Sequence, residues 1–99
     1  MDSLEHIRAT LAASLPDVRE RYHVDRLSLF GSWVRGKQKD ESDVDILVDF
    51  QPGARVGLLA CIALEQELSA SLGRKVDLVT RGALRPRIGE QVLAELVAV

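Results

Sequence analysis

The 99-residue chain has room for one domain with one hydrophobic core, and we expect a single domain over residues 1–99. Aliphatic packing must dominate this core, because 46% of the residues are hydrophobic and only 4% are aromatic. The net charge of −2 argues against direct nucleic-acid binding, which normally needs a basic excess. A lone cysteine, Cys61, excludes an internal disulfide. The chain shows neither a signal-peptide pattern nor an apolar stretch long enough for a bilayer, so a cytoplasmic protein without membrane contact is expected.

The first third of the chain predicts a helix, a strand and a short helix. Asp2 or Ser3 can cap the first helix. Its apolar residues recur at helical spacing and are expected in the core: Leu4, Ile7, Leu11, Leu15 and Val18. Residues 26–30 are typical of a short strand, which Gly31 ends, and residues 32–36 of a short helix.

The middle of the chain predicts a second strand and a longer helix. Residues 37–41 are polar and predict a loop before the strand over residues 44–50. The turn signal at residues 51–53 ends this strand. The helix is predicted over residues 56–72, with Gly73 as its C-terminal stop.

The last part of the chain predicts a strand over residues 75–79 and a helix that begins near Leu84. Pro86 is tolerated in the first turn of that helix, whereas Gly89 weakens it. Its apolar stripe consists of Ile88, Val92, Leu96 and Val99. The element order is therefore α-β-α-β-α-β-α, which predicts an α/β (α+β) fold with a three-stranded sheet packed by about four helices.

Two aspartates stand at the start of the second predicted strand. Side chains two residues apart on a strand point to the same face, so Asp43 and Asp45 present their carboxylates side by side. Two anions this close repel each other, and each loses hydration where it is buried. Mg²⁺ prefers carboxylates, water and substrate phosphates as ligands, so it would offset both costs. The pair therefore indicates a magnesium site.

A third aspartate strengthens this interpretation. Asp77 lies between apolar residues of the third predicted strand, where an unpaired carboxylate would be a poor choice. If the third strand lies beside the second, Asp77 can face the same cleft as Asp43 and Asp45. Three carboxylates would then surround one or two metal ions, as two-metal phosphoryl transfer requires.

A phosphate site is predicted where the first strand ends. Gly31 lets a phosphate approach the backbone closely, and free N–H groups point outward at the start of the next helix. The Ser32 hydroxyl can donate one more hydrogen bond. Arg35, one helical turn further on, could reach a phosphate or brace the acidic strand.

Each of these features also has an ordinary structural explanation. Paired aspartates can be a solvated loop end, and a Gly-Ser turn can simply cap a helix. Asp77 alone can be a surface charge on an edge strand. The combination of all of them at fixed spacing favours the chemical interpretation.

This part of the chain resembles the signature of the DNA polymerase beta superfamily of nucleotidyltransferases, through the pattern Gly31-Ser32-x-x-Arg35-Gly36-x₅-Ser42-Asp43-x-Asp45-x-x-Val48. The short length and the third predicted strand resemble its minimal (MNT) branch. The resemblance extends from the first predicted helix to the last. It implies a small mixed sheet flanked by helices, in agreement with the predicted element order.

The resemblance also implies the roles of individual residues. Nucleotide-binding positions of the family correspond to Gly31, Ser32, Arg35 and Ser42. Catalytic positions that hold Mg²⁺ correspond to Asp43, Asp45 and Asp77. Family members of this type are commonly antitoxins that form hetero-oligomers with a HEPN-type ribonuclease toxin and transfer AMP from ATP to a tyrosine of that toxin. The resemblance therefore implies a metal-dependent nucleotidyltransferase with ATP as substrate.

Two alternatives remain open. The protein could block its partner by binding alone, without catalysis. It could also transfer a nucleotide to a small molecule, although 99 residues leave little structure for a dedicated acceptor pocket. A double variant, Asp43→Ala with Asp45→Ala, separates blocking from catalysis, because only catalysis should be lost.

The remaining candidate residues have structural explanations that we favour. Trp33 could stack on a base, but packing of the short helix is favoured. Cys61 falls in a predicted helix beside Leu58 and Leu59, so it is predicted to be a small buried hydrophobe. The other candidates are expected on the solvated surface: His6, His23, Lys37, Lys39, Arg81, Arg85 and Arg87.

Overall fold

The computed structural model describes residues 3–84 and 86–99. The elements in chain order are α1 (Leu4–Tyr22), β1 (Val24–Phe30), α2 (Ser32–Arg35), β2 (Val44–Phe50), α3 (Leu58–Leu72), β3 (Val76–Thr80), the 3₁₀ turn η1 (Arg81–Ala83), α4 (Pro86–Glu95) and β4 (Val97–Ala98). The strands form one sheet in the order β3-β2-β1-β4. β2 and β3 are parallel, whereas β1 is antiparallel to both β2 and β4. The predicted mixed α/β class is confirmed, and the sheet gains a short fourth strand.

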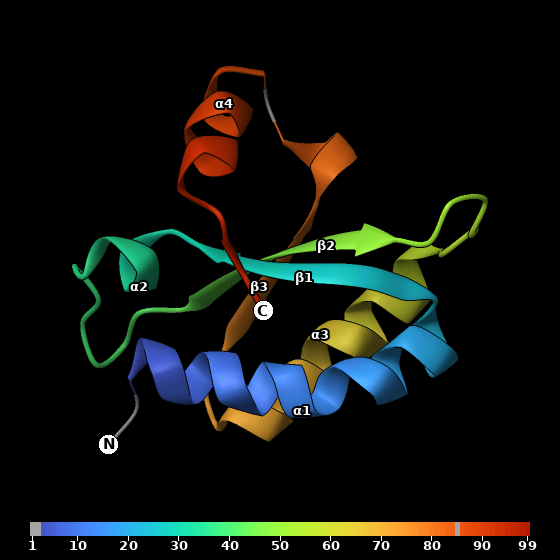
Figure 1. Ribbon diagram of the computed structural model, residues 1–99, viewed down its shortest axis with the longest axis horizontal. Helices are drawn as coiled ribbons and strands as arrows, with labels where there is room; N and C mark the ends of the chain where they lie inside the picture. Colours follow the sequence, from blue (N-terminus) through green and yellow to red (C-terminus); the bar gives the residue numbers. More distant parts are fainter. Residues whose placement is uncertain (1–2, 85) are drawn as a thin grey trace.

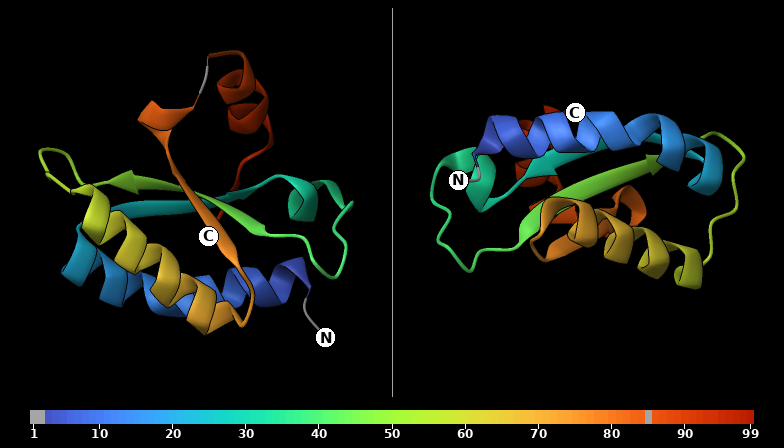
Figure 2. Two further views of the ribbon diagram at one scale, coloured as in Figure 1. Left: turned by 180° about the vertical axis from the view of Figure 1, so that it is seen from behind. Right: turned by 90° about the horizontal axis from the view of Figure 1, so that it is seen from below.

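Helices pack on both faces of the sheet. Figure 1 shows α1 and α3 together beneath the strands and α4 on the opposite side. The two further views in Figure 2 show the same layers, with α1 and α3 side by side. Among the helices within the described ranges, none is both long and apolar enough to cross a membrane.

Alternation along β2 sorts its side chains between the two layers. Three buried residues pack toward α1 and α3: Val44, Ile46 and Val48. On the other face, Leu47 belongs to a smaller apolar cluster that includes Val92 of α4. Asp45 and Asp49 lie two residues to either side of Leu47, so they share its face. The acidic positions of β2 therefore lie on the α4 side of the sheet.

The larger core lies between the sheet and the pair α1 and α3. Four of the predicted stripe residues of α1 are buried: Ile7, Leu11, Leu15 and Val18. Leu64 and Leu68 of α3 pack into the same cluster. The Ser3 side chain caps α1 by accepting a hydrogen bond from the His6 N–H at 3.1 Å, and Gly73 ends α3 in the left-handed conformation. These helix ends agree with the sequence prediction.

The end of the chain differs from the prediction. α4 stops at Glu95, and residues 97–98 pair with β1 instead of continuing the helix. Val97 and Val99 contact the larger cluster, and Leu96 contacts the smaller one. Leu96 and Val99 lie beyond the end of α4, so their assignment to the apolar stripe of the helix is wrong. The β-branched valines suit a strand, and pairing covers an edge of β1 that would otherwise be open. Val92 is buried as predicted, whereas the Ile88 side chain lies outside the described residues.

The prediction for Cys61 is also wrong, because its side chain is only half-buried. Leu58 and Leu59 are 75% and 83% exposed. Leu64 and Leu68 form the buried stripe of α3, and the helical period places Cys61 at the margin of this stripe. The same period places Leu58 and Leu59 outside it. Apolar composition of this segment therefore overstated its burial.

Candidate active site

The three predicted aspartates lie at the end of the sheet where β2 begins. Asp43 directly precedes β2, and Asp45 is its second residue. The parallel register places Asp45 opposite Asp77 on β3. The antiparallel register places Asp45 opposite Phe30, the last residue of β1, so the following Gly31-Ser32 turn lies beside it. Sheet pairing thus brings together groups that are far apart in the sequence.

Gly31 and Asp45 are in direct contact. A Cβ atom at Gly31 would lie 2.1 Å from Asp45 Oδ2, which is far closer than atoms can approach. Gly31 also has a φ of 81°, in the region that favours glycine. Only glycine therefore permits both the turn and the position of the Asp45 carboxylate.

α2 begins at this turn. The N–H groups of Val34 and Arg35 both donate to the Gly31 carbonyl oxygen at 3.1 Å. The N–H groups of Ser32 and Trp33 precede these bonds, at positions where a helix leaves its donors without helical partners. They are the backbone donors that an anion at this turn could use.

The surroundings of Asp45 disfavour the ionised form of its carboxyl group. Burial, followed by the nearby charges of Asp77 and Asp43, raises the pKa of Asp45 to about 6. The Arg35 guanidinium acts in the opposite direction, and Glu95 adds to the rise. A carboxylate whose charge is this unfavourable gains from a bound cation.

The acidic group fits a hard metal ion, but its carboxylates are not gathered around one point. Asp43 Oδ2 lies 3.8 Å from Lys75 Nζ, and Asp77 is exposed. Within residues 3–84 and 86–99, no three acidic, histidine or cysteine side chains form a ready-made metal cluster. A metal ion held by Asp43, Asp45 and Asp77 would have to draw their carboxylates together, and its positive charge would offset their mutual repulsion.

A cavity of about 390 Å³ adjoins Asp43 on the side away from Gly31. It is lined by Asp40, Glu41, Ser42, Asp43, Gly73, Arg74 and Lys75. The Ser42 hydroxyl accepts a hydrogen bond from the Lys39 N–H at 2.8 Å, within the loop before β2. Ser42 therefore shapes this loop, and it lies at the cavity instead of at the Gly31 turn.

Sequence reasoning missed Glu95. Its Oε1 accepts a hydrogen bond from the Gly31 N–H at 3.0 Å, and Arg35 Nη1 lies 3.4 Å from both of its carboxylate oxygens. Glu95 ends α4, 64 residues after Gly31. A spacing this long carries no local signal, so only the fold identifies this residue.

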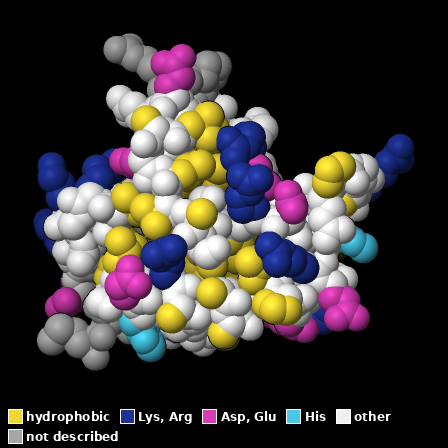
Figure 3. Space-filling view, viewed as in Figure 1, with side chains coloured by type: hydrophobic (Ala, Val, Ile, Leu, Met, Phe, Trp, Pro, Cys, Tyr) yellow, Lys and Arg dark blue, Asp and Glu magenta, His cyan; other side chains and the backbone are white. Residues whose placement is uncertain are grey.

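The other candidates behave mostly as structural residues. Trp33 is buried in the larger core, which confirms packing, and the Arg74 guanidinium lies 4.9 Å from its ring centroid. Arg81 pairs with Asp49 through two contacts of 2.9 Å. The surface residues that agree with the prediction are His6, His23, Lys37, Lys39 and Arg81, whereas Arg85 and the Arg87 side chain lie outside the described residues. Figure 3 shows basic, acidic and apolar side chains interspersed on one face of the molecule.

In this protein a mixed sheet brings a Gly-Ser turn beside aspartates on neighbouring strands. The chain belongs to the nucleotidyltransferase domain family, whose model matches residues 12–99. This membership confirms the superfamily that the motif indicated.

Individual relatives cover nearly the same length. The chain is 46% identical over 99 residues to the protein adenylyltransferase MntA of Thermococcus cleftensis, with 100% of this chain and 98% of the relative covered. A solved structure provisionally described as a minimal nucleotidyltransferase is 38% identical, with a TM-score of 0.81 and 99% and 97% coverage. A chain of a toxin–antitoxin complex with AMP-PNP is 26% identical, with a TM-score of 0.75 over 92% of this chain and 70% of that chain.

Proposed function

We propose that this chain is a metal-dependent protein adenylyltransferase and the antitoxin of a pair, transferring AMP from ATP to a tyrosine hydroxyl of a HEPN-type toxin. The contact between Asp45 Oδ2 and Gly31 carries the proposal, because it joins the acidic group to the phosphate-binding turn. A carboxylate that holds a cation beside free N–H donors provides both halves of a triphosphate site.

On the Gly31 side, the triphosphate of ATP would bind at the start of α2. The Ser32 hydroxyl and the N–H groups of Ser32 and Trp33 are donors that phosphate oxygens can use. Arg35 is about half-exposed, so its guanidinium can turn toward a phosphate.

Asp43, Asp45 and Asp77 would hold Mg²⁺ beside these donors. When bound, Mg²⁺ would neutralise the phosphate charge and favour attack on the α-phosphorus. The raised pKa of Asp45 supports this assignment, because a cation lowers the cost of its ionised form.

The acceptor would approach from the opposite side, where the cavity adjoins Asp43. In-line displacement requires the attacking oxygen and the leaving pyrophosphate on opposite sides of the α-phosphorus. With the pyrophosphate at the Gly31 turn, the cavity lined by Ser42 and Lys75 is the side left for the acceptor. The hydroxyl oxygen would form a bond to the α-phosphorus and lose its proton, while the bond to pyrophosphate breaks.

Two relatives support a protein acceptor and a toxin partner. The Thermococcus cleftensis relative is named a protein adenylyltransferase and covers this chain completely. The complex with AMP-PNP is a toxin–antitoxin pair. The cavity is lined by charged side chains, serine and glycine, which suits the edge of a protein surface better than a small apolar ligand.

The direct test uses ATP labelled separately on its α- and γ-phosphates, together with this protein, Mg²⁺ and the product of the neighbouring gene. Label from the α-phosphate should join the partner, and label from the γ-phosphate should not. Transfer of the γ-label, or none from either position, would contradict adenylyl transfer.

Asp49 provides a matched control on the same strand and face. Asp43→Ala with Asp45→Ala should abolish transfer, whereas Asp49→Asn should preserve it, because Asp49 pairs with Arg81 away from the site. Inhibition of the toxin by the inactive double variant would favour blocking by binding alone. Transfer to a small hydroxyl compound, with no transfer to the partner, would favour the small-molecule alternative.

A further inference from the structure

The last residue of α4 contacts the turn that the proposed reaction uses for phosphate. Glu95 Oε1 accepts the Gly31 N–H hydrogen bond at 3.0 Å. The Glu95 side chain is 21% exposed, so water competes only weakly for this contact. The same carboxylate lies 3.4 Å from Arg35 Nη1, so one side chain reaches both ends of α2.

The fold fixes Glu95 from two directions. It ends α4 on one side, and β4 follows immediately on the other. Val97 pairs with Leu29, and Ala98 pairs with Ser28, both in the strand that leads directly into Gly31. Pairing of β4 with β1 therefore sets the Glu95 carboxylate beside the turn.

The Gly31 N–H group needs an acceptor outside α2, because N–H groups at the start of a helix have no acceptor within the helix. The Asp45 carboxylate lies against its Cα, and Glu95 accepts its N–H hydrogen bond. The orientation of this peptide decides where the next N–H and the Ser32 hydroxyl point. A change at residue 95 should therefore alter the phosphate donors without touching them.

We infer that Glu95 is a positioning residue, which holds the Gly31 turn in its phosphate-binding conformation and keeps the Arg35 guanidinium beside that turn. This inference rests on the proposed nucleotide site and adds a residue to it. Glu95 acts through Gly31 and Arg35, not through the reacting atoms.

A carboxylate at an anion site could instead compete with the incoming phosphate. Two observations favour positioning over competition. The shorter contact of Glu95, at 3.0 Å, is to the Gly31 N–H, whereas its contact with the Arg35 guanidinium is 3.4 Å. The backbone of Glu95 is also held in place, since only Leu96 separates it from Val97, which pairs with Leu29.

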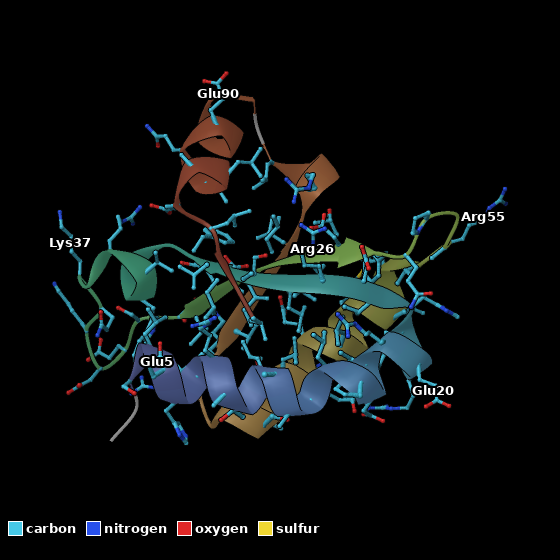
Figure 4. All side chains as sticks on the ribbon, viewed as in Figure 1. Glu5, Glu20, Arg26, Lys37, Arg55 and Glu90 are labelled. Carbon is cyan, nitrogen blue, oxygen red and sulfur yellow. The ribbon has the colours of Figure 1, made fainter. Side chains whose placement is uncertain are left out.

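Binding of AMP-PNP with Mg²⁺, measured by isothermal titration calorimetry, tests this role on three variants. Glu95→Ala should weaken binding about tenfold, as expected for the loss of a hydrogen bond to a charged acceptor. Glu95→Gln should remain within about threefold of the wild type, because its amide oxygen can accept the same hydrogen bond. Glu90→Ala is the matched control on α4, since the Glu90 side chain is exposed and points away from the sheet in Figure 4, and it should leave binding unchanged.

Four outcomes would overturn the inference. Tighter binding by Glu95→Ala would indicate competition, and unchanged binding would make Glu95 a bystander. Equal weakening by Glu95→Ala and Glu95→Gln would place the effect on charge instead of on the Gly31 hydrogen bond. Failure of the wild type to bind AMP-PNP would appear in every protein alike, and would overturn the proposed function together with this inference.

A second variant keeps the test valid if Glu95→Ala does not fold. Glu95→Asp shortens the side chain by one methylene, so its carboxylate should fall short of the Gly31 N–H. We expect weaker AMP-PNP binding and a higher KM for ATP, with a smaller change in kcat. Unchanged AMP-PNP binding by a folded Glu95→Asp variant would also overturn the inference.

Discussion

Asp45→Asn should stabilise the protein in the absence of metal. Burial and two neighbouring aspartates raise the Asp45 pKa from its ordinary 3.8 to about 6, so the folded state binds this proton more tightly than the unfolded state does. The stability linked to this group is therefore present below about pH 4 and is lost as the pH rises through 6. At pH 7 the ionised carboxylate opposes folding, and asparagine removes its charge at nearly the same volume.

The size of the Asp45 pKa shift sets an upper limit on the stability that Asp45→Asn can gain. At about 1.4 kcal/mol for each pH unit, it corresponds to at most ~3 kcal/mol. Asp45 is only half-buried, so solvent screening reduces the expected gain to about 1–2 kcal/mol. For a domain of this size, the melting temperature should rise by roughly 5–10 °C.

Thermal unfolding followed by circular dichroism, with EDTA at pH 7 and at pH 4, measures this effect. The difference between Asp45→Asn and the wild type should be largest at pH 7 and nearly vanish at pH 4. Mg²⁺ should raise the melting temperature of the wild type more than that of the variant. A variant that melts at or below the wild-type temperature at pH 7 without metal would refute the electrostatic reasoning.

Three further predictions concern neighbouring residues. Gly31→Ala should lose ATP binding and cost roughly 2 kcal/mol or more in the free energy of unfolding, because its Cβ would overlap Asp45 Oδ2; near-normal melting and ATP titration would contradict this. Ser32→Ala should raise the KM for ATP about tenfold with little change in melting temperature. Ser42→Ala should leave that KM within about twofold, because the Ser42 hydroxyl accepts a hydrogen bond from the Lys39 N–H, and a larger KM increase for Ser42→Ala than for Ser32→Ala in steady-state kinetics would exchange their roles. Asp49→Asn should lower the free energy of unfolding by about 1 kcal/mol at pH 7, because hydrogen bonding to Arg81 lowers the Asp49 pKa. The stability linked to this carboxylate is lost as the pH falls below 4, so chemical denaturation should show the difference between variant and wild type disappear there.

Local spacing was enough to predict where most of the candidate site residues lie in the fold. The two-residue interval between Asp43 and Asp45 placed them on one face, and a buried valine at position 44 confirms the alternation. The apolar residues around Asp77 predicted a third strand, and the parallel register then placed it opposite Asp45. Periodicity works here because side-chain direction in a strand depends only on residue number.

The features that escaped prediction depend on contacts across the chain. β4 forms because residues 97–98 pair with the open edge of β1. The helical pattern of apolar residues at the end of the chain gives no sign of this pairing. Glu95 comes beside the Gly31 turn only through that pairing. The exposure of Leu58 and Leu59 likewise depends on which face of α3 meets the sheet, and composition cannot decide this.

The proposed adenylyl transfer is tested most directly by intact mass spectrometry of the neighbouring gene's product. That product would be incubated with this protein, ATP and Mg²⁺, and in parallel with the Asp43→Ala, Asp45→Ala variant. Adenylyl transfer should add the mass of one or more AMP units with the wild type and none with the variant. A tight complex without any mass gain would contradict catalysis, and it would leave an antitoxin that acts by binding.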